Sequence, residues 1–257
     1  RRIMSTDPEV VMPPPDTNKT LSPEEKQLLS SWIEQGAKYE RHWAYVPVSR
    51  PDTPEPAGIN EIDAFINARL AQEGLALSPE ADKATLINRL TLDLTGLPPT
   101  LAAVDAFVTD TSANAYENLV DGLLASVEHA EHMTGQWLDI ARWADTDGYL
   151  EDGGNRLLHP WRDWVISAYQ ENMPYDDFLT WQIAGDLLPD ASREQIMATT
   201  FLRLGQRSSE NGIIVEEYDN EYAIDRVETL GVGILGHTVG CARCHDHKYD
   251  PISIKDF

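Results

Sequence analysis

Residues 240–251 read Gly-Cys-Ala-Arg-Cys-His-Asp-His-Lys-Tyr-Asp-Pro, and they contain both cysteines of the chain. Cys241 and Cys244 have the spacing C-x-x-C, and His245 follows directly. This is the pattern by which a c-type haem is attached, because each thiol can form a thioether with one of the two porphyrin vinyl groups. The adjoining histidine can then ligate the iron from the proximal side through its neutral imidazole. The stretch therefore predicts a covalent haem c with His245 as its proximal ligand.

Two other chemistries could use the same residues. Zinc binds thiolates and imidazoles, and a zinc or other metal site here would use Cys241, Cys244, His245 and His247. Three of these four residues are crowded in sequence, and no second C-x-x-C completes a separate half-site. The cysteines could also form a local disulfide or remain as reduced structural thiols. Haem attachment is the preferred interpretation, because both cysteines and the histidine fit one motif.

The motif leaves the sixth ligand of the iron open. His247 is too close to His245 in sequence to reach across the haem, although it stays a candidate metal ligand together with His237. The conceivable distal ligands are His237, Met133, Met173, Met197, His129, His132 and His159. A filled sixth position would favour electron transfer, whereas an open one would favour chemistry on a small molecule.

Outside this motif, apolar residues recur at helical spacing along most of the chain. Ser22-Pro23-Glu24-Glu25 has the N-cap serine, the first-turn proline and the glutamate of a capping box. Helices are predicted at about 22–36, 62–74, 86–96, 101–108, 116–124, 137–143 and 217–235, with one opened by 160–164 and another closed by 185–189. No convincing alternation of apolar residues indicates a strand. The predicted fold is mainly α, with Trp161 and Trp164 in the core.

Four prolines between residues 47 and 56 indicate an extended linker. The prediction is therefore a small helical module at 1–40, a Pro-rich linker at 41–58 and a larger all-α domain at 59–257. The chain begins with Arg1 rather than methionine, so we expect it to be a piece of a longer protein.

The charge balance limits the possible partners. The chain has 20 Lys and Arg residues against 43 Asp and Glu residues, a net charge of -23. Such a surface repels phosphate backbones and anionic lipid heads, so no nucleic-acid partner is expected. It would attract a basic redox partner. No apolar run approaches the ~20 residues that span a bilayer, so no direct membrane insertion is expected.

Two groups of carboxylates could have a functional role. On a helix over 217–235, Glu217, Glu221 and Asp225 would share one face. They could act in acid–base chemistry, bind a metal, or pair with Arg226 and neighbouring arginines, and the structural role is favoured. The second group, Asp145, Asp147 and Asp152, lacks the register and the terminal glutamate of a calcium-binding EF-hand. Helix capping and turn formation explain it better.

The first 40 residues resemble part of a known module. A Met-Pro-Pro loop at 12–14, Leu-Ser-Pro-Glu-Glu at 21–25 and Trp-Ile-x-x-Gly-Ala at 32–37 are similar to the C-terminal half of a class I cytochrome c. In that family the loop methionine is the distal iron ligand. The resemblance implies that Met12 is the thioether ligand of a second, separate haem, whose attachment motif would precede residue 1.

From about Trp43 onward, the chain resembles a family of domains of unknown function found in multidomain planctomycete and verrucomicrobial cytochromes. The stretches that carry the likeness are 92–99, 143–145 with 148–149, 161–166, 184–189, 225–227 and 240–252. His237 departs from the family pattern, in which an apolar residue is expected at this position. The resemblance implies that the chain is a fragment of a larger multidomain cytochrome.

The leading functional hypothesis is electron transfer through covalently bound haem c, which is attached outside the cytoplasm and so implies a periplasmic or other extracytoplasmic location. One alternative is a metal-dependent extracytoplasmic enzyme, acting for example on carbohydrate. Its metal would lie at the Cys–His stretch or among Asp145, Asp147, Glu216 and Glu217. Another alternative is a structural cell-surface module with a Cys241–Cys244 disulfide.

Overall fold

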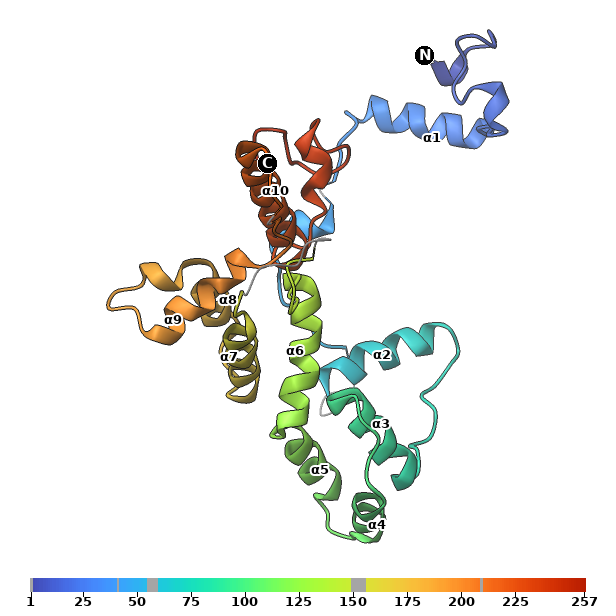
Figure 1. The fold of residues 1–257 in the computed structure, drawn as a ribbon. Helices are drawn as coiled ribbons and strands as arrows, with labels where there is room; N and C mark the ends of the chain where they lie inside the picture. Colours follow the sequence, from blue (N-terminus) through green and yellow to red (C-terminus); the bar gives the residue numbers. More distant parts are fainter. Residues whose placement is uncertain (1, 41, 55–59, 149–155, 209) are drawn as a thin grey trace. The chain divides into compact units, whose positions relative to one another are not determined.

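The structure is a computed structural model that describes residues 2–40, 42–54, 60–148, 156–208 and 210–257. In these ranges the chain forms α-helices joined by loops and short 3-10 helices, and no β-strand occurs (Figure 1). The predicted mainly-α fold is confirmed. None of the helices in the described ranges has the length and apolar character needed to cross a membrane.

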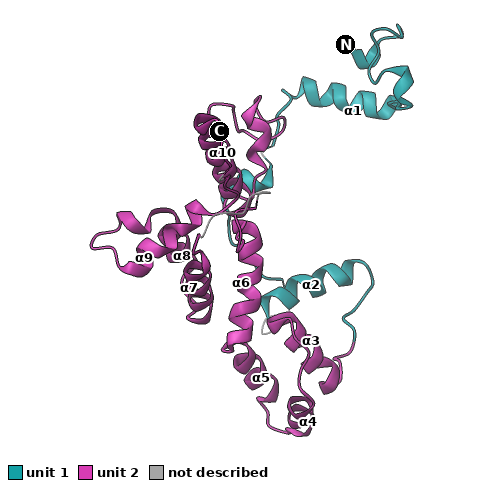
Figure 2. Ribbon diagram, viewed as in Figure 1, with its two compact units in different colours: residues 1–78 teal, residues 79–257 magenta. Residues whose placement is uncertain are grey.

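The chain divides into two compact units, residues 1–78 and 79–257 (Figure 2). This division lies further along the chain than the start at residue 59 that the sequence predicted for the larger domain. The helix α2 (Glu61–Gln72) belongs to unit 1 by its contacts.

Unit 1 also contains α1 (Pro23–Glu34) and the 3-10 helices η1 (Arg2–Met4), η2 (Pro15–Thr17) and η3 (Trp43–Tyr45). The predicted capping box is present. The Ser22 hydroxyl accepts from the Glu25 amide at 3.1 Å, and the Glu25 carboxylate accepts from the Ser22 amide at 2.7 Å. The apolar stripe of α1 stays exposed, with Leu28 at 70% and Ile33 at 60%. Local capping chemistry therefore defines where this helix begins.

The first helices of unit 2 enclose a small core. They are α3 (Lys83–Thr95), α4 (Leu101–Thr109) and α5 (Ala115–Leu124), and they bury Ile87, Phe107 and Ala115. The Asp82 side chain caps α3 by accepting from the Thr85 amide at 2.8 Å. This bond lowers the pKa of Asp82.

The main core of unit 2 is aromatic. It lies among α6 (Val127–Ala141), α7 (His159–Gln170), α8 (Tyr175–Ala184), η4 (Gly185–Leu187), α9 (Arg193–Ala198) and η5 (Thr199–Arg203). Trp161 is fully buried, and Trp164 stacks on Phe178 with ring centroids 5.5 Å apart. The predicted core positions of Trp161 and Trp164 are confirmed.

Helix α6 begins ten residues before the predicted start at Trp137. Its N-cap is Ser126, whose hydroxyl accepts from the His129 amide at 3.2 Å. The buried face consists of Ala130, Thr134, Trp137 and Ala141. Because three of these side chains are small or polar, the apolar periodicity is weak and the prediction missed the first part of the helix.

The last long helix is α10 (Val215–Gly233), which agrees with the predicted helix within two residues at each end. The 3-10 helix η6 (Val239–Arg243) follows and packs on α10. A Cβ on Gly231 of α10 would lie 2.6 Å from the Val239 side chain, so this close approach requires glycine.

The contact between Gly185 and α9 gives a test of the core. A Cβ at Gly185 would overlap the backbone carbonyl of Gln195, which cannot move without displacing α9. We expect Gly185→Ala to lower the free energy of unfolding by about 1–3 kcal/mol. The control is Gly122→Ala on the exposed face of α5, where no atom lies within 4 Å of the added Cβ. There, alanine should raise stability by up to about 1 kcal/mol. Urea unfolding of both variants measures the difference, and equal shifts would contradict the packing.

Candidate functional site

The Cys–His motif forms a tight turn at the end of η6. Cys241 lies within the 3-10 helix, and Cys244 is its C-cap residue with φ -114° and ψ -27°. The amides of Cys244 and His245 both point to the carbonyl oxygen of Cys241, each at 3.4 Å. A 3-10 helix has three residues per turn, so side chains three positions apart lie on the same side. Cys241 and Cys244 therefore share one face of the turn, and both are exposed and unbridged.

A second side of the same turn holds it to the protein. Val239 and Ala242 are buried, again three positions apart. The third side of the turn contacts acidic residues of α10. Gly240 lies beside Glu228. Arg243 binds Glu221, with Nη1 and Oε2 3.3 Å apart. The hydrogen bond to Glu221 raises the pKa of Arg243. Burial of one face thus presents both thiols to solvent.

His245 follows the turn and is exposed. Its Nδ1 lies 2.8 Å from the carbonyl oxygen of Asp246. A carbonyl oxygen can only accept, so Nδ1 carries the proton and donates it to this bond. The neutral ring then has its lone pair on Nε2. This is the tautomer in which a histidine ligates a metal through Nε2 while the second nitrogen is held by the backbone.

His247 has a different environment from His245. Its side chain is only 10% exposed, and its Nδ1 accepts from the Asp250 amide at 2.9 Å. Its own amide donates to the Ile252 carbonyl at 2.8 Å. His247 therefore holds the loop after the motif in shape. His237, the other histidine near the motif, is half-buried, and its amide donates to the Gly231 carbonyl at 2.8 Å.

The remaining candidate iron ligands are spread over both units. His129 Nδ1 lies 2.7 Å from the Leu94 carbonyl, and the His132 ring lies against Gly96. Met173 and Met197 pack on the main core, Met133 is half-buried and His159 is exposed at the start of α7. Met12, in the loop before α1, belongs to unit 1 and is 39% exposed.

Within the described ranges, no group of three or more His, Cys, Asp or Glu side chains is arranged to hold a metal ion. Asp145, Glu216 and Glu217 are exposed, and Asp152 lies outside the described residues.

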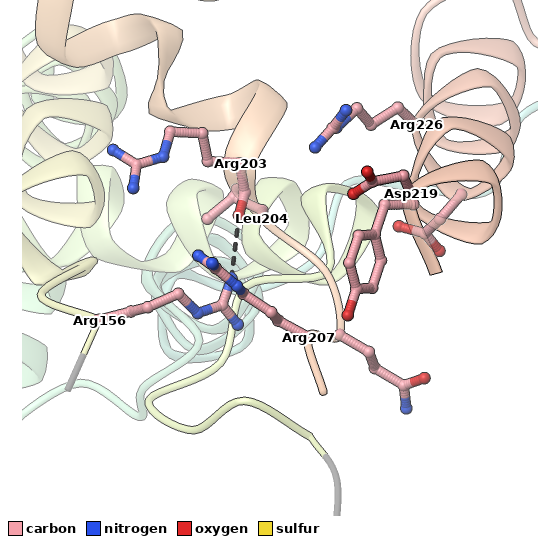
Figure 3. Close-up of a pocket in the computed structure, with 9 residues that line it drawn as sticks. Arg156, Arg203, Leu204, Arg207, Asp219 and Arg226 are labelled. Atoms are coloured by element: carbon pink, nitrogen blue, oxygen red, sulfur yellow. Dashed lines mark hydrogen bonds between the residues drawn. The ribbon is translucent and has the colours of Figure 1, made fainter. Parts of the chain in front are cut away.

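Two of the three carboxylates predicted on one face of α10 pair with arginines, and neither of these two pairs with Arg226. Glu221 binds Arg243 and Asp225 binds Arg142. Arg142 ends α6 in the left-handed conformation with φ 58°, which turns the chain after the helix. Arg226 instead lines a pocket beside the helix (Figure 3). The structural role that the sequence favoured thus holds for Glu221 and Asp225, with Arg243 and Arg142 as the partners that the fold brings to them.

Asp147 forms a buried ion pair that the sequence did not predict. Its side chain is 3% exposed and binds Nε of Arg156, whose side chain is 14% exposed. Arg156 also donates to the carbonyl oxygens of Arg203 and Gly205, each at 3.0 Å. The carbonyl of Asp147 accepts from the Arg207 amide at 3.0 Å. Asp147 and Arg156 thus join two loops that are about fifty residues apart in the chain.

A comparison with protein-family models matches residues 61–257 to the family PSCyt2, described as "Protein of unknown function (DUF1549)". The chain belongs to this family. No curated protein and no solved structure matches it.

The PSCyt2 match begins at the first residue of α2 and includes the Cys–His turn, the α10 carboxylates and the Asp147–Arg156 pair. The predicted membership of a family of unknown function is confirmed. Residues 1–40, whose sequence resembles part of a cytochrome c, lie outside the match.

The Asp147–Arg156 pair gives a test of this region of the PSCyt2 domain. Asp147→Asn keeps the shape of the side chain but leaves the Arg156 guanidinium without its buried counter-charge. We expect the free energy of unfolding to fall by about 3 kcal/mol. The control is Asp163→Asn, which removes the carboxylate of the exposed pair with Arg162 and should change stability little. Denaturant unfolding measures both, and an equally small effect at Asp147 would contradict the structural role.

Proposed function

We propose that the chain is a haem c-binding electron-transfer protein, with haem attached at Cys241 and Cys244 and His245 as the axial ligand. The observation that carries the proposal is the geometry of the turn. Both thiols lie on one exposed face, and the next residue is an exposed histidine whose Nδ1 lies 2.8 Å from the Asp246 carbonyl oxygen, so that Nε2 is the nitrogen left for a metal. Covalent attachment of a haem uses two accessible thiols, and a neighbouring imidazole can serve as the axial ligand of its iron. The exposure of Cys241, Cys244 and His245 supports the proposal.

Each residue would have a separate task. Cys241 and Cys244 would anchor the porphyrin through thioethers, and His245 would bind the iron through Nε2. The carbonyl of Asp246 would hold the His245 ring in the required tautomer and increase its basicity as a ligand. When bound, the haem would supply a one-electron redox centre.

The surroundings of the turn support a fixed position for this centre. Val239 and Ala242 are buried on one side, and the Arg243–Glu221 pair holds another. A rigid attachment point limits the structural change that accompanies electron transfer. The net charge of -23 favours a basic redox partner, and haem c attachment implies a periplasmic or otherwise extracytoplasmic protein.

The first test is covalent haem content. After expression with a c-haem maturation system, we expect a c-type pyridine haemochrome spectrum and a denatured mass increased by one haem. Both should be lost when Cys241→Ser and Cys244→Ser are combined. Lys248→Gln, an exposed substitution in the following loop, should keep the haem.

An unmodified mass would overturn the proposal, provided that the same cells mature a reference cytochrome c. Zinc analysis and a thiol count would then separate the two alternatives, a metal site at the Cys–His stretch and a Cys241–Cys244 disulfide.

We also propose that Met12 serves a second, separate haem, as its resemblance to a cytochrome c loop implies. Met12 belongs to unit 1, and its amide donates to the Arg2 carbonyl at 3.2 Å, which ties the loop to the start of the chain. Its thioether is accessible at 39% exposure.

This assignment predicts that Met12→Ala in the present chain leaves the haem at Cys241 and Cys244 unchanged. Haem content, the visible spectrum and the reduction potential should all match those of the unsubstituted chain. A shifted spectrum or a lower potential would mean that Met12 ligates this same iron, and the separate-haem assignment would be wrong.

A further inference from the structure

Unit 2 concentrates arginine around one pocket although the chain is strongly acidic. The pocket has a volume of about 240 Å³ and is lined by four arginines, Arg156, Arg203, Arg207 and Arg226. Figure 3 shows Arg226 and Asp219 on the α10 side of the pocket, with the other three arginines across from them. The whole chain has only 20 Lys and Arg residues against 43 Asp and Glu residues. Four arginines around one pocket are therefore not expected from the composition of the chain, and the surroundings of the pocket must explain them.

Three of these arginines have no partner for their charge among the residues that the structure describes. In the part of the chain that the structure describes, the guanidinium groups of Arg203, Arg207 and Arg226 form no ion pair and no hydrogen bond. Carboxylates are close by, but Asp225 is already bound to Arg142. The unpaired guanidinium groups are thus available to a ligand.

The fourth arginine, Arg156, lines the pocket with a side chain that is held in place by its own contacts. Arg156 is held by Asp147 and by the carbonyl oxygens of Arg203 and Gly205, which together use three of its five N–H groups. Figure 3 shows the bond between Arg156 and the Arg203 carbonyl as a dashed line. The two remaining N–H groups can donate to a ligand without reorganisation of the side chain.

Tyr222 adds a neutral donor. Its hydroxyl oxygen accepts from the Ser208 amide at 2.8 Å, which leaves the hydroxyl hydrogen free to donate. Tyr222 and Asp219 both line the pocket from α10.

The charge balance indicates the kind of ligand. Arg156 is neutralised by Asp147, and Asp225 by Arg142. Among the lining residues that the structure describes, what remains is three positive guanidinium groups against the one carboxylate of Asp219, a surplus of two positive charges. The volume is below the ~300 Å³ at which pockets for drug-sized ligands begin. A small dianion, or the doubly charged end of a larger molecule, matches both charge and size.

We propose that this pocket is a binding site for a tetrahedral oxyanion, either a free phosphate or sulfate ion or the phosphate group of a monoester. The unpaired guanidinium groups come from three separate segments, η5, the loop after it and α10. A tetrahedral group presents oxygens in several directions and can accept from all three, whereas a carboxylate has two oxygens in one plane. This inference is independent of the proposed haem function, because it uses none of the Cys–His residues.

Isothermal titration of the full chain tests the proposal. The probes are inorganic phosphate, inorganic sulfate, phenyl phosphate and phenyl sulfate, all at constant ionic strength set with potassium chloride. We expect saturable binding at one site per chain for the preferred anion. Tighter binding of an ester than of the free ion would assign the site to the end of a larger molecule.

Two substitutions and a matched control localise the binding. Arg226→Gln and Arg207→Gln should each weaken it by about tenfold or more, since each removes a charge-assisted hydrogen bond. Arg89→Gln changes the net charge equally at an exposed position of α3 and should leave the affinity unchanged. Because these side chains are exposed, circular dichroism and thermal unfolding without ligand should match the parent chain.

Three outcomes would overturn the proposal. One is the absence of saturable binding by all four probes. The second is an equal affinity in Arg226→Gln and Arg89→Gln, which would indicate a general effect of the anions rather than this pocket. The third is tighter binding of malonate than of phosphate and sulfate, which would assign the site to carboxylates instead.

Discussion

The buried ion pair between Asp147 and Arg156 is the constraint on which one side of unit 2 depends. A charge with little solvent contact needs both a counter-charge and further hydrogen bonds, or its desolvation destabilises the fold. Arg156 meets this need by donating to two carbonyl oxygens at the end of η5, while the Asp147 carbonyl accepts from the Arg207 amide. The pair thereby fixes the backbone from which Arg203 and Arg207 extend. Four arginines meet at one pocket because this backbone is held beside α10.

Helix α10 supports two distinct features. The Cys–His turn contacts it at Glu221, Glu228 and Gly231, whereas the arginine pocket uses Asp219, Tyr222 and Arg226. Successive residues of an α-helix are rotated by about 100°, so these two sets lie on different faces. The proposed haem site and the proposed anion site can therefore be altered separately. The 3-10 turn separates its residues in a similar way, because it has three residues per turn. Val239 and Ala242 therefore lie on a buried side of the turn, and the two thiols lie on an exposed side.

The fold was largely predictable because most of its helices begin and end with local signals. The capping box at Ser22, the glycine after α3 and the apolar spacing of α10 each act within a few residues. The start of α6 was missed since its buried face is built from alanine and threonine, whose burial is set by neighbouring helices. Likewise, the predicted partners of the α10 carboxylates were Arg226 and neighbouring arginines, whereas the fold brings Arg142 and Arg243 to Asp225 and Glu221.

The sequence by itself determined the helical class, the family and the residues of the Cys–His motif, because these depend on composition and on short-range spacing. Only the tertiary structure decided which side of that motif faces solvent, which nitrogen of His245 lies beside the Asp246 carbonyl and which arginines line one pocket. Residues such as Asp147 and Arg207 are sixty positions apart, and no local pattern encodes their contact. Such contacts arise from the packing of whole helices, which brings together charges that the sequence separates.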